Sequence, residues 1–244
     1  MPPAWAALAR GKTRLLGSHR GWDAGALAVA RSLSLRLQAP LVATTVTRLL
    51  VDANRSPHNP AVFSELTRDL PRSERARLLA RLHAPHWRHV RAELDRIGEP
   101  VIHLAIHSFT EKLGPTPRRF DVGLLYDPAR TGESSWAARL KAQLRAADPT
   151  LRVRRNAPYR GRSDGLVTAL RKERAASGYR GLEVELNQTH LRRASDRAWL
   201  VERLCASLLA VARAERDGST RPGAVSTRCR PDSTGPRSAQ DRRS

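Results

Sequence analysis

The chain has 244 residues and a formal net charge of +21 at pH 7, and its length suits one substantial domain. The charge does not predict a specific nucleic-acid-binding protein, because it comes almost entirely from arginines that are spread through the predicted helices rather than gathered in one stripe. Aromatic residues, 5% of the chain, are too few to form a base-stacking surface, and the arginine bias is typical of a GC-rich coding sequence.

The first half of the chain predicts a helix, a strand and a longer helical segment. Residues 22–37 place apolar side chains on one helical face, and Pro40 lies beyond the end. The segment 41–47 is β-branched and mostly apolar, which predicts an interior strand. The helical pattern at 71–98 is interrupted by Pro85, so it predicts two helices or one kinked helix.

From residue 100 onward, predicted strands and helices alternate along the chain. We expect strands at 100–106, 120–126, 151–155 and 181–186, and helices at 134–147, 163–177 and 195–215. Ser163 is a candidate cap for the second of these helices. The alternation predicts an α/β fold with three layers, in which a mixed, mainly parallel sheet has helices on both faces.

A change of composition near residue 215 predicts the domain boundary. Residues 1–215 form one predicted domain, whereas 216–244 have no apolar periodicity and are predicted to be a disordered tail rich in Arg, Ser and Pro. Cys205 falls in the last helix and Cys229 in the tail, so we expect no disulfide. No segment has transmembrane length and no secretory h-region opens the chain, so we expect a cytoplasmic protein without a membrane partner.

Polar side chains at the ends of strands are the first candidates for a site, because open α/β sheets bind ligands at the carboxyl ends of their strands. His107 follows the apolar run 101–106. A neutral imidazole there can bind zinc, with Ser108 and Thr110 hydrogen-bonded around it, or can simply hydrogen-bond to a loop. His103 shares the same strand face but lies deeper, which favours a structural role.

A second candidate feature is the pair Asn54 and Arg55, which follows an apolar run that ends at Asp52. A guanidinium beside an amide suits a substrate carboxylate, because arginine can bind both carboxylate oxygens at once. Arg48 lies at the opposite end of the run and is expected to be an ion-pair partner, for example of Asp52.

Alternating residues near position 184 supply two carboxylates. Glu183 and Glu185 fall on the strand face opposite Leu182, Val184 and Leu186. These carboxylates either face a cleft or lie at a solvent-exposed strand edge. The three imidazoles of His83, His86 and His89 belong instead to a helical segment and turn through successive faces, which favours surface or packing roles.

Five stretches of the chain, taken in order, resemble the N-formylglutamate amidohydrolase family, a group of metal-dependent amide hydrolases distantly similar to the zinc carboxypeptidases. The matching stretches cover most of residues 16–191 and read SHRGWDAG at 18–25, RLLVDANR at 48–55, IHSFT at 106–110, FDVGLLY at 120–126 and GLEVELNQ at 181–188. The resemblance implies a phosphorylase/hydrolase-like fold of the zinc exopeptidase type.

The resemblance also implies roles for individual residues. It makes His107 a ligand of a catalytic Zn²⁺, with Asp23 or His19 as a further ligand, although Asp23 also suits an ordinary helix N-cap. It makes Glu185 the general base, with Glu183 beside it as an orienting group.

The resemblance further implies that Asn54 and Arg55 hold the α-carboxylate of an N-formyl or N-acyl amino acid, the expected small-molecule substrate. The family's opening strand, with a Glu-His or Pro-His motif that contributes to the metal site, has no counterpart before Leu15. The sequence therefore predicts either a start assigned too far downstream or a shortened, impaired enzyme. The alternative function is a carboxylate- or polyanion-binding protein without turnover.

Overall fold

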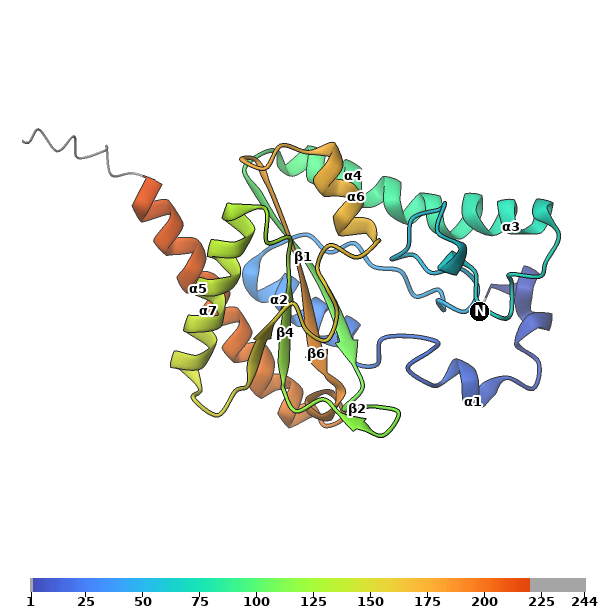
Figure 1. The fold of residues 1–244 in the computed structure, drawn as a ribbon, viewed down its shortest axis with the longest axis horizontal. Helices are drawn as coiled ribbons and strands as arrows, with labels where there is room; N and C mark the ends of the chain where they lie inside the picture. Colours follow the sequence, from blue (N-terminus) through green and yellow to red (C-terminus); the bar gives the residue numbers. More distant parts are fainter. Residues whose placement is uncertain (1, 220–244) are drawn as a thin grey trace, which may run out of the picture.

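The computed structural model describes residues 2–219, and its centre is a four-stranded sheet (Figure 1). The strand order is β1-β6-β4-β5. β1 pairs with β6, and β4 with β5, in parallel, whereas β4 and β6 are antiparallel. The sheet is therefore mixed and mainly parallel, as predicted. The bounds are Val101–Phe109 for β1, Val122–Leu125 for β4, Val153–Arg155 for β5 and Tyr179–Asn187 for β6.

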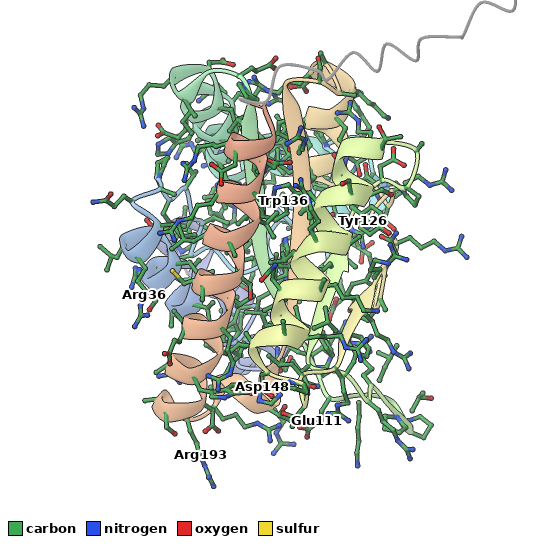
Figure 2. The ribbon with its side chains drawn as sticks, turned by 90° about the vertical axis from the view of Figure 1, so that its left-hand side faces the viewer. Arg36, Glu111, Tyr126, Trp136, Asp148 and Arg193 are labelled. Carbon is green, nitrogen blue, oxygen red and sulfur yellow. The ribbon has the colours of Figure 1, made fainter. Side chains whose placement is uncertain are left out.

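One face of the sheet carries the main apolar core. Alternate residues of the central strands, such as Leu124 and Leu186, point to this face and are fully buried. They pack against the three helices α2 (Ala26–Leu37), α5 (Thr131–Ala147) and α7 (Ala194–Ser219). Figure 2 shows α5 and α7 side by side over the sheet. Burial of this apolar cluster stabilises the fold.

The opposite face carries both a smaller core and the polar residues. Helices α4 (Ala84–Ile97) and α6 (Leu166–Glu173) cover it through a cluster that includes Trp87, Leu170 and Tyr179. Tyr179 and the alternating residues after it on β6 share this face by the period of two. Helices thus lie on both faces, which confirms the predicted three layers.

The remaining elements belong to the N-terminal half of the chain or follow the ends of the sheet strands. Trp5, Leu50, Val62 and Leu78 form a third apolar cluster there. The elements are the helices η1 (Pro3–Ala9), α1 (Thr13–Leu16), η2 (Pro60–Val62), α3 (Arg72–Leu78), η3 (Leu79–His83) and η4 (Gln188–Leu191), and the hairpin of β2 (Lys112–Leu113) and β3 (Thr116–Pro117). The π-helical turn η3 joins α3 to α4 just before Pro85, which confirms the predicted interruption.

Three predicted features differ from the structure. The segment 41–47 forms no strand, and β1, the edge strand, pairs only with β6. A β-branched run becomes a strand only when a neighbour bonds to its backbone, so this prediction was wrong. α2 begins at Ala26 rather than residue 22, and α6 begins after Gly165, so Ser163 is not its cap.

The C-terminal helix is longer than predicted. α7 continues through Ser219, so the first residues assigned to the tail are helical. Residues 220–244, including Cys229, lie outside the described part of the chain. Within that part Cys205 is a buried free thiol, and no helix is both long and apolar enough to cross a membrane.

Candidate active site

His107 and Glu185 lie side by side on the polar face of the sheet. They are register partners on the parallel strands β1 and β6, so their side chains leave the same face. Glu183 is one alternation earlier on β6 and shares that face. The acidic residues that were predicted to oppose Leu182 therefore face an imidazole rather than open solvent.

The orientation of His107 is fixed by Asp23. Nδ1 of His107 lies 2.8 Å from Oδ2 of Asp23, and Arg48 donates to the other carboxylate oxygen of Asp23. Asp23 is therefore not the N-cap of α2, and Arg48 pairs with Asp23 rather than with the predicted Asp52. Because Nδ1 is occupied, Nε2 of His107 points to Glu183, whose Oε2 is 3.9 Å away.

Charge within this group shifts two pKa values in opposite directions. Burial acts to raise the pKa of Asp23, but the hydrogen bond and charge of His107, together with Arg48, lower it below its usual value. Burial acts to lower the pKa of His107, but Asp23 and the two glutamates outweigh it and raise that pKa to about 9. The imidazole is thus held protonated at neutral pH by the surrounding carboxylates.

Glu185 is a buried carboxyl group on the polar face of the sheet. The residue is 5% exposed, and its Oε2 atom has no hydrogen-bond partner among residues 2–219. Burial raises the pKa of Glu185 to about 7; the charge of His107 opposes this shift, and Asp23 and Glu183 reinforce it. A carboxyl group with such a pKa can both accept and return a proton near neutral pH.

The backbone beside Glu185 requires a glycine. Gly123 on β4 is the register partner of Glu185. A Cβ atom at Gly123 would lie 2.0 Å from the carbonyl oxygen of Ala157 and 3.2 Å from Cβ of Glu185. The absent side chain therefore lets the loop 156–165 approach the sheet next to the buried carboxylate.

Asn54 and Arg55 reach the same region from the loop after residue 51. Nδ2 of Asn54 donates to Oε2 of Glu183 at 3.5 Å, and Oδ1 of Asn54 accepts from the backbone of Leu166 at 3.3 Å. Arg55 donates to the carbonyl oxygen of Asp164 at 3.4 Å, and its side chain is 41% exposed. Nε of Arg55 also lies 4.0 Å from Oδ2 of Asp52, so the guanidinium is held on two sides and is partly accessible to solvent.

His83 and Trp87 of the helical segment contact backbone carbonyl oxygens of this loop. Nε2 of His83 lies 2.8 Å from the carbonyl oxygen of Arg55, and Nε1 of Trp87 donates to that of Ala53 at 2.7 Å. The two rings contact each other at 4.8 Å between centroids. The sequence predicted a surface or packing role for His83 and did not predict this contact, although the spacing of four residues places both rings on one helical face.

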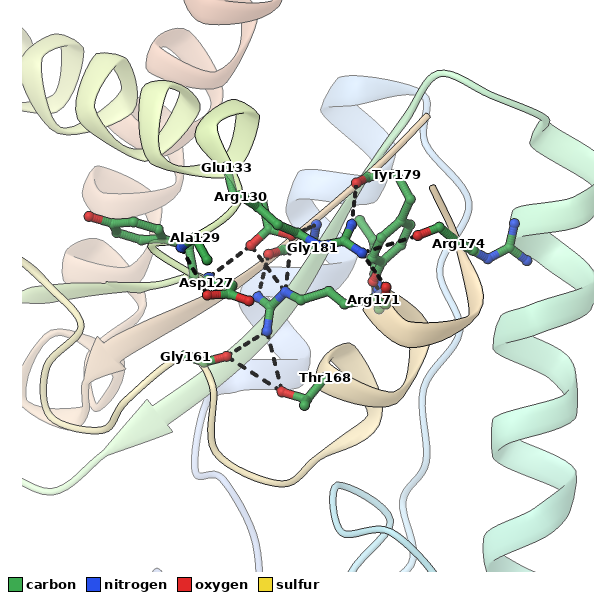
Figure 3. A network of polar contacts seen from close by, with 12 residues as sticks. Asp127, Ala129, Arg130, Glu133, Gly161, Thr168, Arg171, Arg174, Tyr179 and Gly181 are labelled. Carbon is green, nitrogen blue, oxygen red and sulfur yellow. Dashed lines mark hydrogen bonds and ion pairs between the residues drawn. The ribbon is translucent and has the colours of Figure 1, made fainter. Parts of the chain in front are cut away.

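A buried ion pair joins α5 to α6 near the start of β6 (Figure 3). Arg171 of α6 and Glu133 of α5 are nearly inaccessible, with a distance of 3.0 Å between Nε and Oε1. Arg171 also donates to the carbonyl oxygens of Gly161 and Gly181, and Glu133 accepts from the backbone of Gly181. The network ties the loop 156–165 to the start of β6, the strand that carries both glutamates.

Other predicted residues take no direct part in this group. His19 is exposed. Ser108 donates to the carbonyl oxygen of Ala24, and Thr110 to that of Lys112, so neither orients His107. His103 contacts the hydroxyl of Tyr179 at 2.9 Å, deeper along β1, in agreement with the structural role expected for it.

The described residues fit a zinc ion only in part. Nε2 of His107 and Oε2 of Glu183 face one another and can serve as two donors. Asp23 is engaged at the far side of the imidazole, so it orients His107 instead of completing the set. A catalytic zinc takes three protein ligands, whereas residues 2–219 contain no group of three His, Cys, Asp or Glu side chains placed to hold a metal ion.

Comparison with known proteins gives the class of this fold and site. The sequence model of the N-formylglutamate amidohydrolase family matches residues 1–191. The chain therefore belongs to the N-formylglutamate amidohydrolase family.

A solved structure shares the fold. The crystal structure of the gene product Atu2144 from Agrobacterium tumefaciens has a TM-score of 0.75 and 28% sequence identity to this chain, over 88% of this chain and 87% of that one. No curated protein matches the sequence. The predicted family and fold class are thus confirmed.

Proposed function

We propose that this protein hydrolyses the amide bond of an N-formyl or N-acyl amino acid of the N-formylglutamate type. Membership of the family supports an amidohydrolase that acts on carbon–nitrogen bonds other than peptide bonds. The observation that carries the proposal is the buried carboxylate of Glu185, which faces His107 and has an oxygen without a hydrogen-bond partner.

Glu185 acts as the general base in this proposal. Its carboxylate takes a proton from the water that attacks the amide carbonyl, and then returns that proton to the leaving amine nitrogen. His107, oriented by Asp23, presents Nε2 to the same space and hydrogen-bonds to the carbonyl oxygen, on which negative charge develops. The substrate α-carboxylate binds to Arg55 and Asn54.

A zinc ion, when bound, would take Nε2 of His107 in place of its hydrogen bond to the carbonyl oxygen and Oε2 of Glu183 as its second donor, the two donors that the described residues supply. Zinc contributes Lewis acidity when it is bound to a hydrolase of this kind. Because the donor set lacks a third ligand in the described part of the chain, the steps above involve only the protein's own side chains.

Glu185→Gln tests the assignment. The amide keeps the shape of the carboxylate but cannot accept the proton, so hydrolysis of N-formyl-L-glutamate should fall by at least ~10²-fold. Glu202→Gln, at an exposed glutamate on α7, is the matched control and should retain full activity. Formate release within a few-fold of the wild-type rate in Glu185→Gln would exclude Glu185 as the base.

A second candidate function is favoured by the incomplete donor set. A family member that binds a carboxylated ligand or another anion without turnover needs Arg55 and Asn54 but not Glu185. Wild-type protein that binds L-glutamate, with no formate release at any metal concentration, would support this alternative.

A further inference from the structure

Arg118 carries a guanidinium that is held by aromatic rings and not by a carboxylate. Its Cζ atom lies 5.7 Å from the ring centroid of Phe109 and 5.4 Å from that of Tyr159. It also donates to the hydroxyl of Tyr159 at 3.5 Å. No acidic side chain among residues 2–219 forms an ion pair with it. The rings restrict the side chain while the charge stays available for an anion.

Both rings belong to segments that adjoin the proposed catalytic pair. Phe109 is two residues beyond His107 on β1 and shares its strand face. Tyr159 is two residues beyond Ala157, whose carbonyl oxygen packs against Gly123 next to Glu185. Arg118 is therefore placed at the margin of the site from two independent directions.

The loop 156–165 also contacts Arg55, at Asp164 near the C-terminal end of the loop. Asp164 holds the side chain of Arg55, next to Asn54, which contacts Glu183. Along the paired strands, Glu183 lies one alternation before the level of His107 and Glu185, and Phe109 lies one alternation after it. Arg55 and Arg118 thus lie on opposite sides of His107 and Glu185 along the direction of the strands.

We propose that Arg118 binds the side-chain carboxylate of a dicarboxylic N-acyl amino acid and so selects glutamate-type over glutamine-type substrates. This assignment rests on the proposed function, in which Arg55 holds the α-carboxylate. A guanidinium binds a carboxylate through two charge-assisted hydrogen bonds, whereas a side-chain amide offers one neutral oxygen and no charge. Selection follows because the amide leaves the cation without a counter-ion.

Equilibrium binding of the two free amino acids tests Arg118 without any need for turnover. Calorimetry compares L-glutamate and L-glutamine on the full chain, on Arg118→Gln and on Arg118→Lys. Arg119→Gln and Arg154→Gln are the matched controls: Arg119 is the exposed neighbour, and Arg154 lies over the ring of Phe120 alone. Thermal melts verify that each variant is folded.

We expect wild-type protein to prefer L-glutamate by about tenfold or more, which corresponds to one or two charge-assisted hydrogen bonds. Arg118→Gln should lose this preference through weaker binding of L-glutamate, with the affinity for L-glutamine unchanged. Arg118→Lys should restore part of it, and both control variants should keep it. The same order is expected for hydrolysis of N-formyl-L-glutamate and N-formyl-L-glutamine.

The two proposals fail in different ways. Loss of hydrolysis of both substrates with an intact, Arg118-dependent preference in binding would overturn the proposed function and support the assignment of Arg118. A preference that persists in Arg118→Gln, that disappears in Arg154→Gln instead, or that is absent from the wild-type protein would overturn the assignment of Arg118.

Discussion

The interaction of Asp23 with His107 determines what the imidazole can do. A carboxylate at Nδ1 fixes the ring orientation and leaves Nε2 as the ring nitrogen that faces Glu183. Arg48 neutralises the second oxygen of Asp23, so the carboxylate cannot turn toward a ligand without breaking an ion pair. Asp23 thus orients the imidazole, and Nε2 of His107 is left to interact with a ligand.

Zinc uptake should depend on His107, because its Nε2 is the imidazole nitrogen that lies 3.9 Å from a Glu183 oxygen in the described part of the chain. We expect the wild-type protein to bind added Zn²⁺ weakly, since two donors fall short of the usual three. His107→Ala should abolish this uptake, and His19→Ala, at an exposed imidazole, should leave it intact. Metal analysis after dialysis measures both, and equal stoichiometry in wild type and His107→Ala would remove His107 from the zinc site.

At the scale of elements, η3 and α4 support the loop that carries Asn54 and Arg55. His83 and Trp87 hold two carbonyl oxygens of the segment that presents Asn54 and Arg55. Since a carbonyl oxygen only accepts, Nε2 of His83 must carry the proton in this contact. Burial lowers the pKa of His83, which keeps the ring neutral in that tautomer.

His83→Phe should weaken substrate binding more than catalysis, because it releases Arg55 and leaves Glu185 in place. Loss of one hydrogen bond, worth about 1 kcal/mol, predicts a KM raised roughly fivefold with little change in kcat. His83→Gln, which retains an N–H donor, should restore most of the affinity. An equal fall in kcat in both variants, with KM unchanged, would show that His83 acts on the chemistry instead.

The buried pair of Glu133 and Arg171 joins three elements and should be sensitive to the loss of one partner. Glu133→Gln leaves the guanidinium buried without a counter-charge, so the free energy of unfolding should fall by about 3–5 kcal/mol. Glu93→Gln, at the exposed pair with Arg96, should have little effect. Urea denaturation measures both, and a loss in Glu133→Gln as small as that in Glu93→Gln would contradict the structural role.

Local pattern and long-range contact differ in how well they could be predicted. The alternation around Glu185 and the run before His107 correctly predicted β6 and β1, because side-chain direction follows from the period of two. The contact of Asp23 with His107 and the ion pair of Glu133 with Arg171 join distant elements. These two contacts depend on how the elements pack against one another, and a local sequence pattern does not encode that packing.

At the scale of the whole molecule, Asp121 links β4, β5, β6 and η4 at one end of the sheet. Asp121 accepts hydrogen bonds from the backbone and guanidinium of Arg152, which precedes β5, at 2.8–3.0 Å, and contacts Nε2 of His190 in η4 at 2.9 Å. Its own carbonyl oxygen accepts from the backbone of Asn187 on β6. Burial acts to raise the pKa of Asp121, but these hydrogen bonds outweigh it and hold the pKa well below its usual value.

This lowered pKa predicts how stability responds to acid. A carboxyl group whose pKa is lower in the folded than in the unfolded state stabilises the fold above its unfolded pKa of about 3.9. That contribution is lost as the pH falls through the folded pKa. The formal charge of +21 at pH 7 increases as other carboxylates are protonated, and the added repulsion acts in the same direction.

Asp121→Asn should therefore cost about 1–3 kcal/mol of unfolding free energy at pH 7, since it weakens charge-assisted hydrogen bonds to Arg152 and His190. Wild type and variant should approach each other as the pH falls from the unfolded-state pKa of about 3.9 toward the lower folded-state pKa, because the unfolded carboxylate then binds a proton and the wild-type advantage is progressively lost. Asp69→Asn, at an exposed aspartate, should follow the wild-type curve throughout. Urea unfolding across this pH range gives the comparison, and a difference between wild type and Asp121→Asn that stays constant with pH would show that packing, rather than the charge of Asp121, joins β4 to β5 and η4.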